Sequence, residues 1–193
     1  MIATYGYQNA FISKQIFRGS FHGALFCIFH SSMKFRIENF PGLLLAGHHT
    51  VSSFAQDDTP ALWRGFMPLR NSIAARIGTD LYNVQLYPCL PNSDAFDADT
   101  LFTRWAAVAV SRGGNLPESM SVLEMPAGIY AVFLHRGGPA TAAQSFAFIY
   151  GQWLPSSGYI LDDRPHFEVL GARYNNSHPD SEEEIWVPVR RRG

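Results

Sequence analysis

Short apolar runs bounded by turn residues predict six β-strands in this chain. Several of these runs alternate apolar and polar positions, which is the pattern of a strand with two different faces. Pro41 and Gly42 precede the first run, and Pro126 and Gly128 precede the fourth. The predicted strands cover residues 43–49, 82–88, 104–110, 129–135, 166–174 and 184–189.

Two further segments have the apolar spacing of amphipathic helices. The first is predicted to start at Thr59 and Pro60, since threonine is a favoured cap and proline fits the first helical position. Its apolar residues are Leu62, Phe66, Leu69 and Ile73. The second follows a predicted capping box from Thr141 to Gln144. Its apolar stripe, at positions i, i+3, i+4 and i+7, is Phe146, Ile149, Tyr150 and Trp153.

The two predicted helices belong to an internal repeat. "LWRGFMP" (62–68) aligns with "IYGQWLP" (149–155), at a constant offset of 87 positions (149 − 62). Each helix segment follows one predicted strand and precedes two more. We therefore predict an α+β fold with antiparallel sheets, in which a strand–helix–strand–strand module is duplicated around a pseudo-two-fold axis. Repeat one covers about 33–112 and repeat two about 121–192, and a linker at 111–120 joins them.

Residues 1–32 lack a clear helical or strand period. We predict that they form an N-terminal extension that is poorly ordered and too short for a DNA-binding module with its own core. The predicted domain then runs from Met33 to Gly193, beginning at "MKFRIENFPG".

Composition and charge narrow the functional classes. The formal net charge of −1 lacks the basic excess typical of nucleic-acid binders, so we expect no direct DNA binding. Cys27 and Cys89 lie far apart in the sequence, which favours a reduced, cytoplasmic protein. No apolar run is long enough to span a membrane. We expect no cofactor and no metal: His48 and His49 should point to opposite strand faces, and no phosphate loop or dinucleotide motif occurs.

The strand alternation separates aliphatic residues from rings and carboxylates. In 184–189, Ile185, Val187 and Val189 share one face, which we expect the helices to cover, and Glu184 and Trp186 share the other. Applied to all four inner strands, this reasoning predicts a second face that carries Gln85, Tyr87, Trp105, Glu168, Glu184 and Trp186.

A face with rings and carboxylates predicts a binding groove for a flat or amphipathic organic cation, because rings attract cations by about 0.5–2 kcal/mol each. Tyr150 and Trp153 could reach this groove from the end of the second helix, and core packing is their alternative role. The alternative for Glu168 and Glu184 is that both are solvent-exposed strand residues beside shielding tryptophans.

The order of four strings resembles the GyrI-like small-molecule-binding family, which is also the effector-binding domain of AraC- and MerR-type drug-responsive regulators. The strings are "MPAGIYAVFLHRG", "IYGQWLPSSGY", "DDRPHFEVL" and "EEEIWVPV", and the resemblance covers roughly Met33 to Arg192. It implies a pseudo-symmetric α+β fold with a central ligand groove. It also implies that the family glutamates fall on Glu168 and Glu184, with Trp186 at the aromatic position.

The resemblance leaves three functions open. The first is a stand-alone binding module for lipophilic cationic or aromatic compounds, acting in sensing or sequestration. The second is a hydrolase of strained cyclopropane-containing toxins, with Glu184 as the candidate catalytic residue. The third is inhibition of DNA gyrase as a protein partner. We expect residues 1–32 to lack the helix-turn-helix domain that the family's regulators carry.

Overall fold

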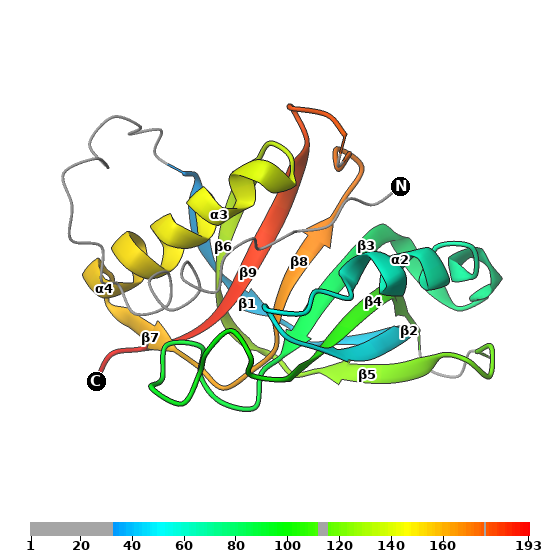
Figure 1. Ribbon diagram of the computed structural model, residues 1–193, viewed down its shortest axis with the longest axis horizontal. Coiled ribbons are helices and arrows are strands. Elements are labelled where there is room, and N and C mark those ends of the chain that lie inside the picture. Colours follow the sequence, from blue (N-terminus) through cyan, green and yellow to red (C-terminus); the bar gives the residue numbers. More distant parts are fainter. Residues whose placement is uncertain (1–32, 112–115, 176) are drawn as a thin grey trace.

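The computed structural model describes residues 33–111, 116–175 and 177–193. The predicted extension at 1–32 lies outside the described residues, as does part of the predicted linker. A mostly antiparallel sheet with a few helices makes up the described part, which confirms the α+β prediction (Figure 1).

The strands pair antiparallel throughout the sheet, in the order β1-β6-β9-β8-β3-β4-β2-β5, and β7 pairs with β9. All six predicted strands are present, although β8 ends four residues before the predicted limit of 174. Strands β1, β5 and β7 lay outside the predicted set. The strands are β1 (Phe35–Phe40), β2 (Leu43–Ser52), β3 (Arg76–Leu86), β4 (Phe102–Val110), β5 (Ser121–Met125), β6 (Gly128–Arg136), β7 (Tyr159–Leu161), β8 (His166–Leu170) and β9 (Glu182–Arg191).

The helices start and end differently from the prediction. Helix α2 (Thr59–Phe66) stops before Leu69 and Ile73, which lie around a short 3₁₀ turn, η1 (Arg70–Ser72). Asp58 is the cap and Thr59 is the first helical residue, whose backbone N–H donates to a carboxylate oxygen of Asp57 at 3.1 Å.

The second helical region has three parts, which are α3 (Pro139–Phe148), the π-helical segment η2 (Ile149–Trp153) and α4 (Leu154–Ser156). The predicted capping box is absent from it. The Thr141 hydroxyl donates instead to the Gly138 carbonyl at 2.9 Å, and Gly138 precedes the helix.

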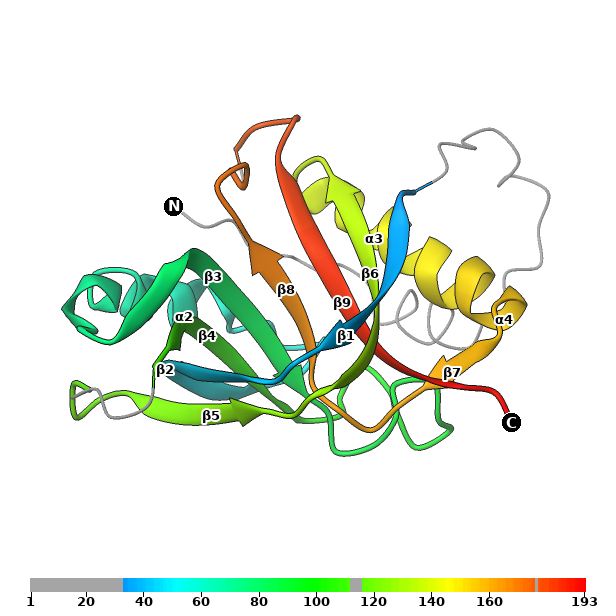
Figure 2. The same ribbon diagram turned by 180° about the vertical axis from the view of Figure 1, so that it is seen from behind.

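The strand order of the sheet is palindromic. Each strand of one half of the chain occupies the position, counted from one edge, that its counterpart in the other half occupies from the opposite edge. One half contributes β3-β4-β2 and the other β8-β9-β6, and the central contact joins β3 to β8. The two edge strands are exchanged, because β1 pairs with β6 and β5 pairs with β2. Figure 2 shows β1 beside β6 while β2, the next strand in the chain, lies with the other half. The exchange connects the halves into one continuous sheet.

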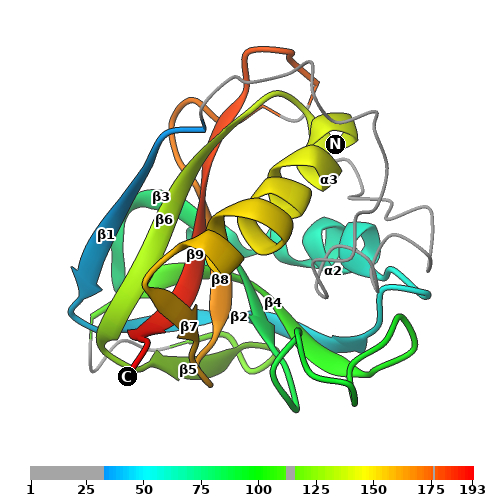
Figure 3. The ribbon, with the colours of Figure 1, turned by 90° about the vertical axis from the view of Figure 1, so that its left-hand side faces the viewer.

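Both helical regions cover the same face of the sheet (Figure 3). Leu62, Trp63 and Phe66 of α2 are buried over β2 and β4. Phe146, Ile149 and Trp153 are buried over β6 and β9, where Ile185, Val187 and Val189 complete the cluster. Burying each large apolar side chain contributes about 1.5–3 kcal/mol, so these clusters hold the two helices to the sheet. The central strands β3 and β8 lie between them.

Candidate functional site

A strip of buried polar residues lies between the two helix-covered clusters, on the helix side of β8, β3 and β4. The strand registers fix this arrangement, because Glu168 pairs with Asn83, and the row formed by His166, Gln85 and Arg104 lies beside it on the same face. All five side chains are buried. Buried polar residues require partners, so a cluster of this kind inside an otherwise apolar layer marks a candidate site. We call Asn83, Gln85, Arg104, His166 and Glu168 the polar strip.

Glu168 is the acidic member of the polar strip and is only 4% exposed. The side-chain amide of Asn83 donates to its Oε2 at 2.5 Å. Burial raises the pKa of Glu168 above its ordinary value, and the Asn83 hydrogen bond, the positive charge of Arg104 and a hydrogen bond from Gln85 offset only part of that rise. The carboxylate is therefore held in place without a directly bonded cation among the described residues, and it is available to one.

His166 connects the polar strip to the helical region. Its Nδ1 lies 3.0 Å from the hydroxyl of Tyr150, which extends from the π-helical segment. Burial and the nearby positive charge of Arg164 lower the pKa of His166 to about 3, so its ring is neutral at physiological pH. A π-helical turn often marks a functional position, and this one carries the Tyr150 hydroxyl that meets His166.

Aromatic side chains lie beside His166 and close enough to Glu168 to feel its charge. Tyr87 packs at 5.1 Å against the His166 ring, and burial raises the pKa of Tyr87. Burial likewise raises the pKa of Tyr174, and the charges of Glu183 and Glu168 raise it further. A cavity of about 170 Å³, which Tyr87 also lines, reaches the polar strip at His166. The site therefore combines a carboxylate with neutral rings.

Unpaired atoms add to the case for a binding site. Within the described ranges, three buried polar atoms at or next to the polar strip have no hydrogen-bond partner, namely Asn83 Oδ1, Arg104 Nε and Tyr174 Oη. Each such atom costs free energy unless water or a ligand satisfies it, by about 1–3 kcal/mol. Water or a bound molecule at the polar strip could satisfy all three of these atoms.

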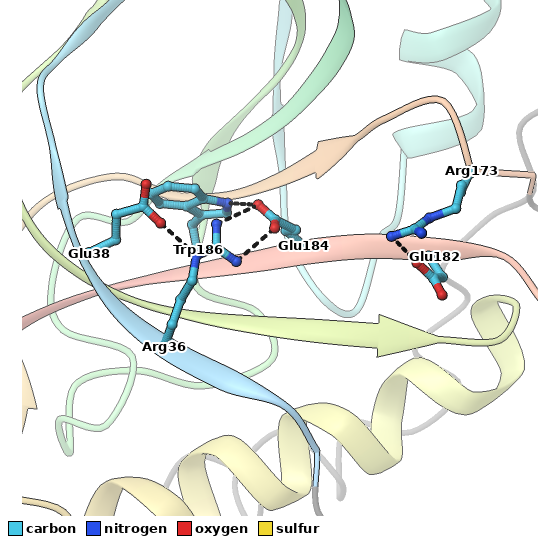
Figure 4. Close-up of polar contacts among 6 residues, drawn as sticks. All are labelled: Arg36, Glu38, Arg173, Glu182, Glu184 and Trp186. Carbon is cyan, nitrogen blue, oxygen red and sulfur yellow. Dashed lines mark hydrogen bonds and ion pairs between the residues drawn. The ribbon is translucent and has the colours of Figure 1, made fainter.

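Glu184 and Trp186 lie on the opposite face of the sheet, beside β1 (Figure 4). Arg36 donates to both carboxylate oxygens of Glu184, at 2.7 and 3.1 Å, and the indole N–H of Trp186 donates to Oε2 at 3.0 Å. The guanidinium lies 5.5 Å from the Trp186 ring centre, and Glu38 binds its Nε. The charge of Glu184 is therefore already paired within the protein.

The structure thus divides the residues that the sequence analysis placed on one face. Glu168, Gln85 and Tyr87 lie on the helix side, and Tyr150 approaches them from η2. Glu184, Trp186 and Trp105 lie on the other side; Trp105 stacks on His49 at 4.5 Å, and Trp186 stacks on Phe167 at 5.1 Å. Trp153 points to neither group, since its ring packs 4.9 Å from Phe133 and 5.5 Å from Phe35.

The single-face prediction was wrong because alternation shows which residues share a face but not which face the helices cover. In β9 and β4 the aliphatic residues do face the helices. In β8 and β3 they do not, because Phe167 and Val84 pack into an aromatic cluster on the far side, with Phe40, Tyr130 and Trp186. Sequence reasoning also missed Asn83 and Arg104, although a charged residue inside an apolar strand was a usable signal.

Comparisons with known proteins agree with this description. Residues 33–190 match the sequence profile of the GyrI-like small molecule binding domain. The transcriptional regulator BrlR of Pseudomonas aeruginosa is 27% identical over 159 residues, which cover 82% of this chain and 56% of BrlR. The chain therefore spans little more than half the length of that regulator.

Solved structures share the fold at low identity. The structure of SAV2435 bound to tetraphenylphosphonium matches with a TM-score of 0.61 at 16% identity, over 82% of this chain and 94% of that one. The C-terminal domain of EcmrR matches with a TM-score of 0.61 at 12% identity, over 83% of this chain and 99% of that one.

Membrane-spanning helices and metal clusters are both absent from the described residues. No helix among them is long and apolar enough to cross a membrane. They contain no group of three or more histidine, cysteine or acidic residues placed to hold a metal ion. His48 and His49 face opposite sides of β2, with His48 beside Phe66 of α2 and His49 on Trp105.

Proposed function

Because the chain belongs to the GyrI-like small-molecule-binding family, we propose that it binds lipophilic organic cations at the polar strip between α2 and α3. The observation that carries this proposal is Glu168, a buried carboxylate that accepts a hydrogen bond from the neutral amide of Asn83 and has no bonded cation within the described ranges. The ligand class is an aromatic or amphipathic cation, and the ligand charge is the partner that Glu168 lacks.

The physical basis is the cost of a buried charge. Burial raises the pKa of Glu168, so its ionised form is held at a cost that a bound cation would offset. The neutral rings of Tyr87, Tyr150 and His166 exclude water, and the tyrosine faces also attract cations. A small hydrophilic cation would lose its hydration shell without apolar compensation, so the site favours lipophilic ones.

The structural neighbours support this chemistry. SAV2435 was solved with tetraphenylphosphonium, a lipophilic cation, and it shares the fold of this chain. The palindromic strand order also supports the inference that the two halves are related by a pseudo-two-fold axis through the β3–β8 contact. Such an axis would place the polar strip at the junction of the two modules.

We infer a biological role in sensing or sequestering such compounds. The match to BrlR, a transcriptional regulator, favours sensing, and the formal net charge of −1 gives this chain no electrostatic preference for DNA. A sensing role would therefore require a partner or a segment that reads the bound state.

The direct test uses two probes of equal shape and opposite charge. Isothermal titration calorimetry of the full chain with tetraphenylphosphonium and with tetraphenylborate separates charge recognition from simple hydrophobic binding. We expect saturable binding of the cation and at least about tenfold weaker binding of the anion, equivalent to about 1.4 kcal/mol. Equal affinities for both probes, or no heat with either, would reject a cation site.

A further inference from the structure

Arg104 is a buried cation at the edge of the polar strip. It lies on β4, on the same face as Glu168, and only 2% of its surface is exposed. Its guanidinium carbon lies 5.2 Å from the centre of the Phe102 ring. Its Nε is fully buried and has no hydrogen-bond partner in the part of the chain that the structure describes.

Among the residues that the structure describes, the charge of Arg104 also lacks a direct counter-ion. Across residues 33–111, 116–175 and 177–193, no ion pair within 4.0 Å involves Arg104. Gln85, which is neutral, is its register partner on β3. Glu168 and Arg104 attract each other only at longer range. Tyr87 lies close enough to both that each charge shifts its pKa, in opposite directions.

The polar strip therefore carries one buried negative and one buried positive charge that do not touch. A ligand that is only a cation would pair Glu168 and leave the buried Arg104 charge uncompensated on the same face of the sheet, which is costly. A ligand that carries a carboxylate as well as a cationic ring system would pair both. Arginine is well suited to this, because its fork binds a carboxylate with two charge-assisted hydrogen bonds.

We propose that Arg104 determines ligand specificity and that the site prefers zwitterionic aromatic compounds, which carry a carboxylate beside a delocalised cation. This inference rests on the proposed function and adds a second contact to the same site. Nothing in the amino-acid composition indicates it, since the chain has nearly equal numbers of acidic and basic residues overall.

The test compares a dye with its own free acid. Rhodamine 6G is an esterified cation, and rhodamine 19 is the same ring system with a free carboxylate. Fluorescence anisotropy titrations of the full chain should show tighter binding of rhodamine 19, by about tenfold. In Arg104→Met the preference should disappear, mainly through loss of affinity for the acid. Arg64→Met, on the exposed face of α2, is the control and should keep the wild-type preference.

Arg104→Gln provides a second variant that keeps a hydrogen-bond donor in case the methionine variant does not fold. It too should bind the two dyes equally. Equal affinities of the wild type for the two dyes would overturn this inference and leave the cation site in place. A preference for rhodamine 19 that survives in a folded Arg104 variant would do the same. If the folded wild-type protein bound none of the three compounds (rhodamine 6G, rhodamine 19 and tetraphenylphosphonium), the proposed function and this inference would both be overturned.

Discussion

Glu168 and Glu184 lie on neighbouring strands but extend from opposite faces of the sheet. Glu168 pairs with Ile185, the residue next to Glu184, so the register separates the two carboxylates by the thickness of the sheet. Only one of them is already bound to an arginine, and that is Glu184. The two acids therefore differ in what they can do, and Glu168 is the one available to a cationic ligand.

Cation binding should depend on pH through Glu168. Burial raises the pKa of this carboxyl above its ordinary value of 4.5, and only the ionised form attracts a cation. Affinity for tetraphenylphosphonium should therefore rise as the pH increases through that raised pKa, measured by calorimetry between about pH 5 and about pH 8. The Glu168→Gln variant should show weak binding with a flat pH profile. A steep profile in that variant would assign the titration to another group.

The stability of the fold should fall in acid because of His166. Its pKa is about 3 in the folded protein, against 6.5 ordinarily, so the unfolded chain binds the proton more readily. The stabilisation that neutral His166 provides is fully present above pH 6.5 and is lost as the pH falls from there toward 3. Over that range the free energy of unfolding should decrease by at most about 1.4 kcal/mol per pH unit because of His166.

Urea unfolding at several pH values would measure this slope for the wild type and for His166→Gln, which can still bond Tyr150. The variant should have the shallower slope between about pH 6.5 and about pH 4. His178→Gln, at an exposed loop position, is the control and should follow the wild type. Parallel slopes for all three proteins would show that His166 does not control acid unfolding.

The Arg36–Glu184 pair should act as a structural contact between β1 and β9. The Arg36 side chain is 47% exposed and that of Glu184 31%, so solvent screens the pair. A double-mutant cycle with Arg36→Met and Glu184→Gln should give a coupling of about 0.5–1 kcal/mol that shrinks in high salt. Ligand affinity should stay at the wild-type value in both single variants. Loss of binding in Glu184→Gln would move the ligand site to the other face.

Trp153 should matter for folding and not for binding. Its ring is enclosed by Phe35, Phe133 and Tyr159, away from the polar strip. Trp153→Ala should lower the free energy of unfolding by about 3–5 kcal/mol. Trp153→Phe should cost less and leave the affinity for tetraphenylphosphonium unchanged. A folded Trp153→Phe variant that no longer binds the cation would show that the indole contacts the ligand.

The sequence predicted the elements of this fold better than it predicted the site. Apolar runs located the strands because strand periodicity depends only on neighbouring residues. Which face each strand presents depends on long-range packing, and here Phe167 and Val84 join the cluster around Trp186 rather than the helices. Placing Glu168 and Glu184 together followed from assigning every aliphatic side to the helices.

Other features escaped the sequence analysis for similar reasons. Strand β1 pairs with β6, about a hundred positions later in the chain, so no local pattern marks its partner. Arg36 and Glu184, which are 148 positions apart, meet only through that pairing. The Glu168 prediction itself came from its neighbour pattern in "HFEVL", and the structure adds the groups that surround it.

The most direct measurement is the affinity of tetraphenylphosphonium for the wild type, Glu168→Gln and Glu184→Gln, compared at one pH near neutrality. Both variants remove one carboxylate charge, so they are matched in net charge and in shape. We predict that Glu168→Gln loses at least about tenfold in affinity, while Glu184→Gln binds like the wild type. Unchanged affinity in a folded Glu168→Gln protein, or a loss confined to Glu184→Gln, would contradict it.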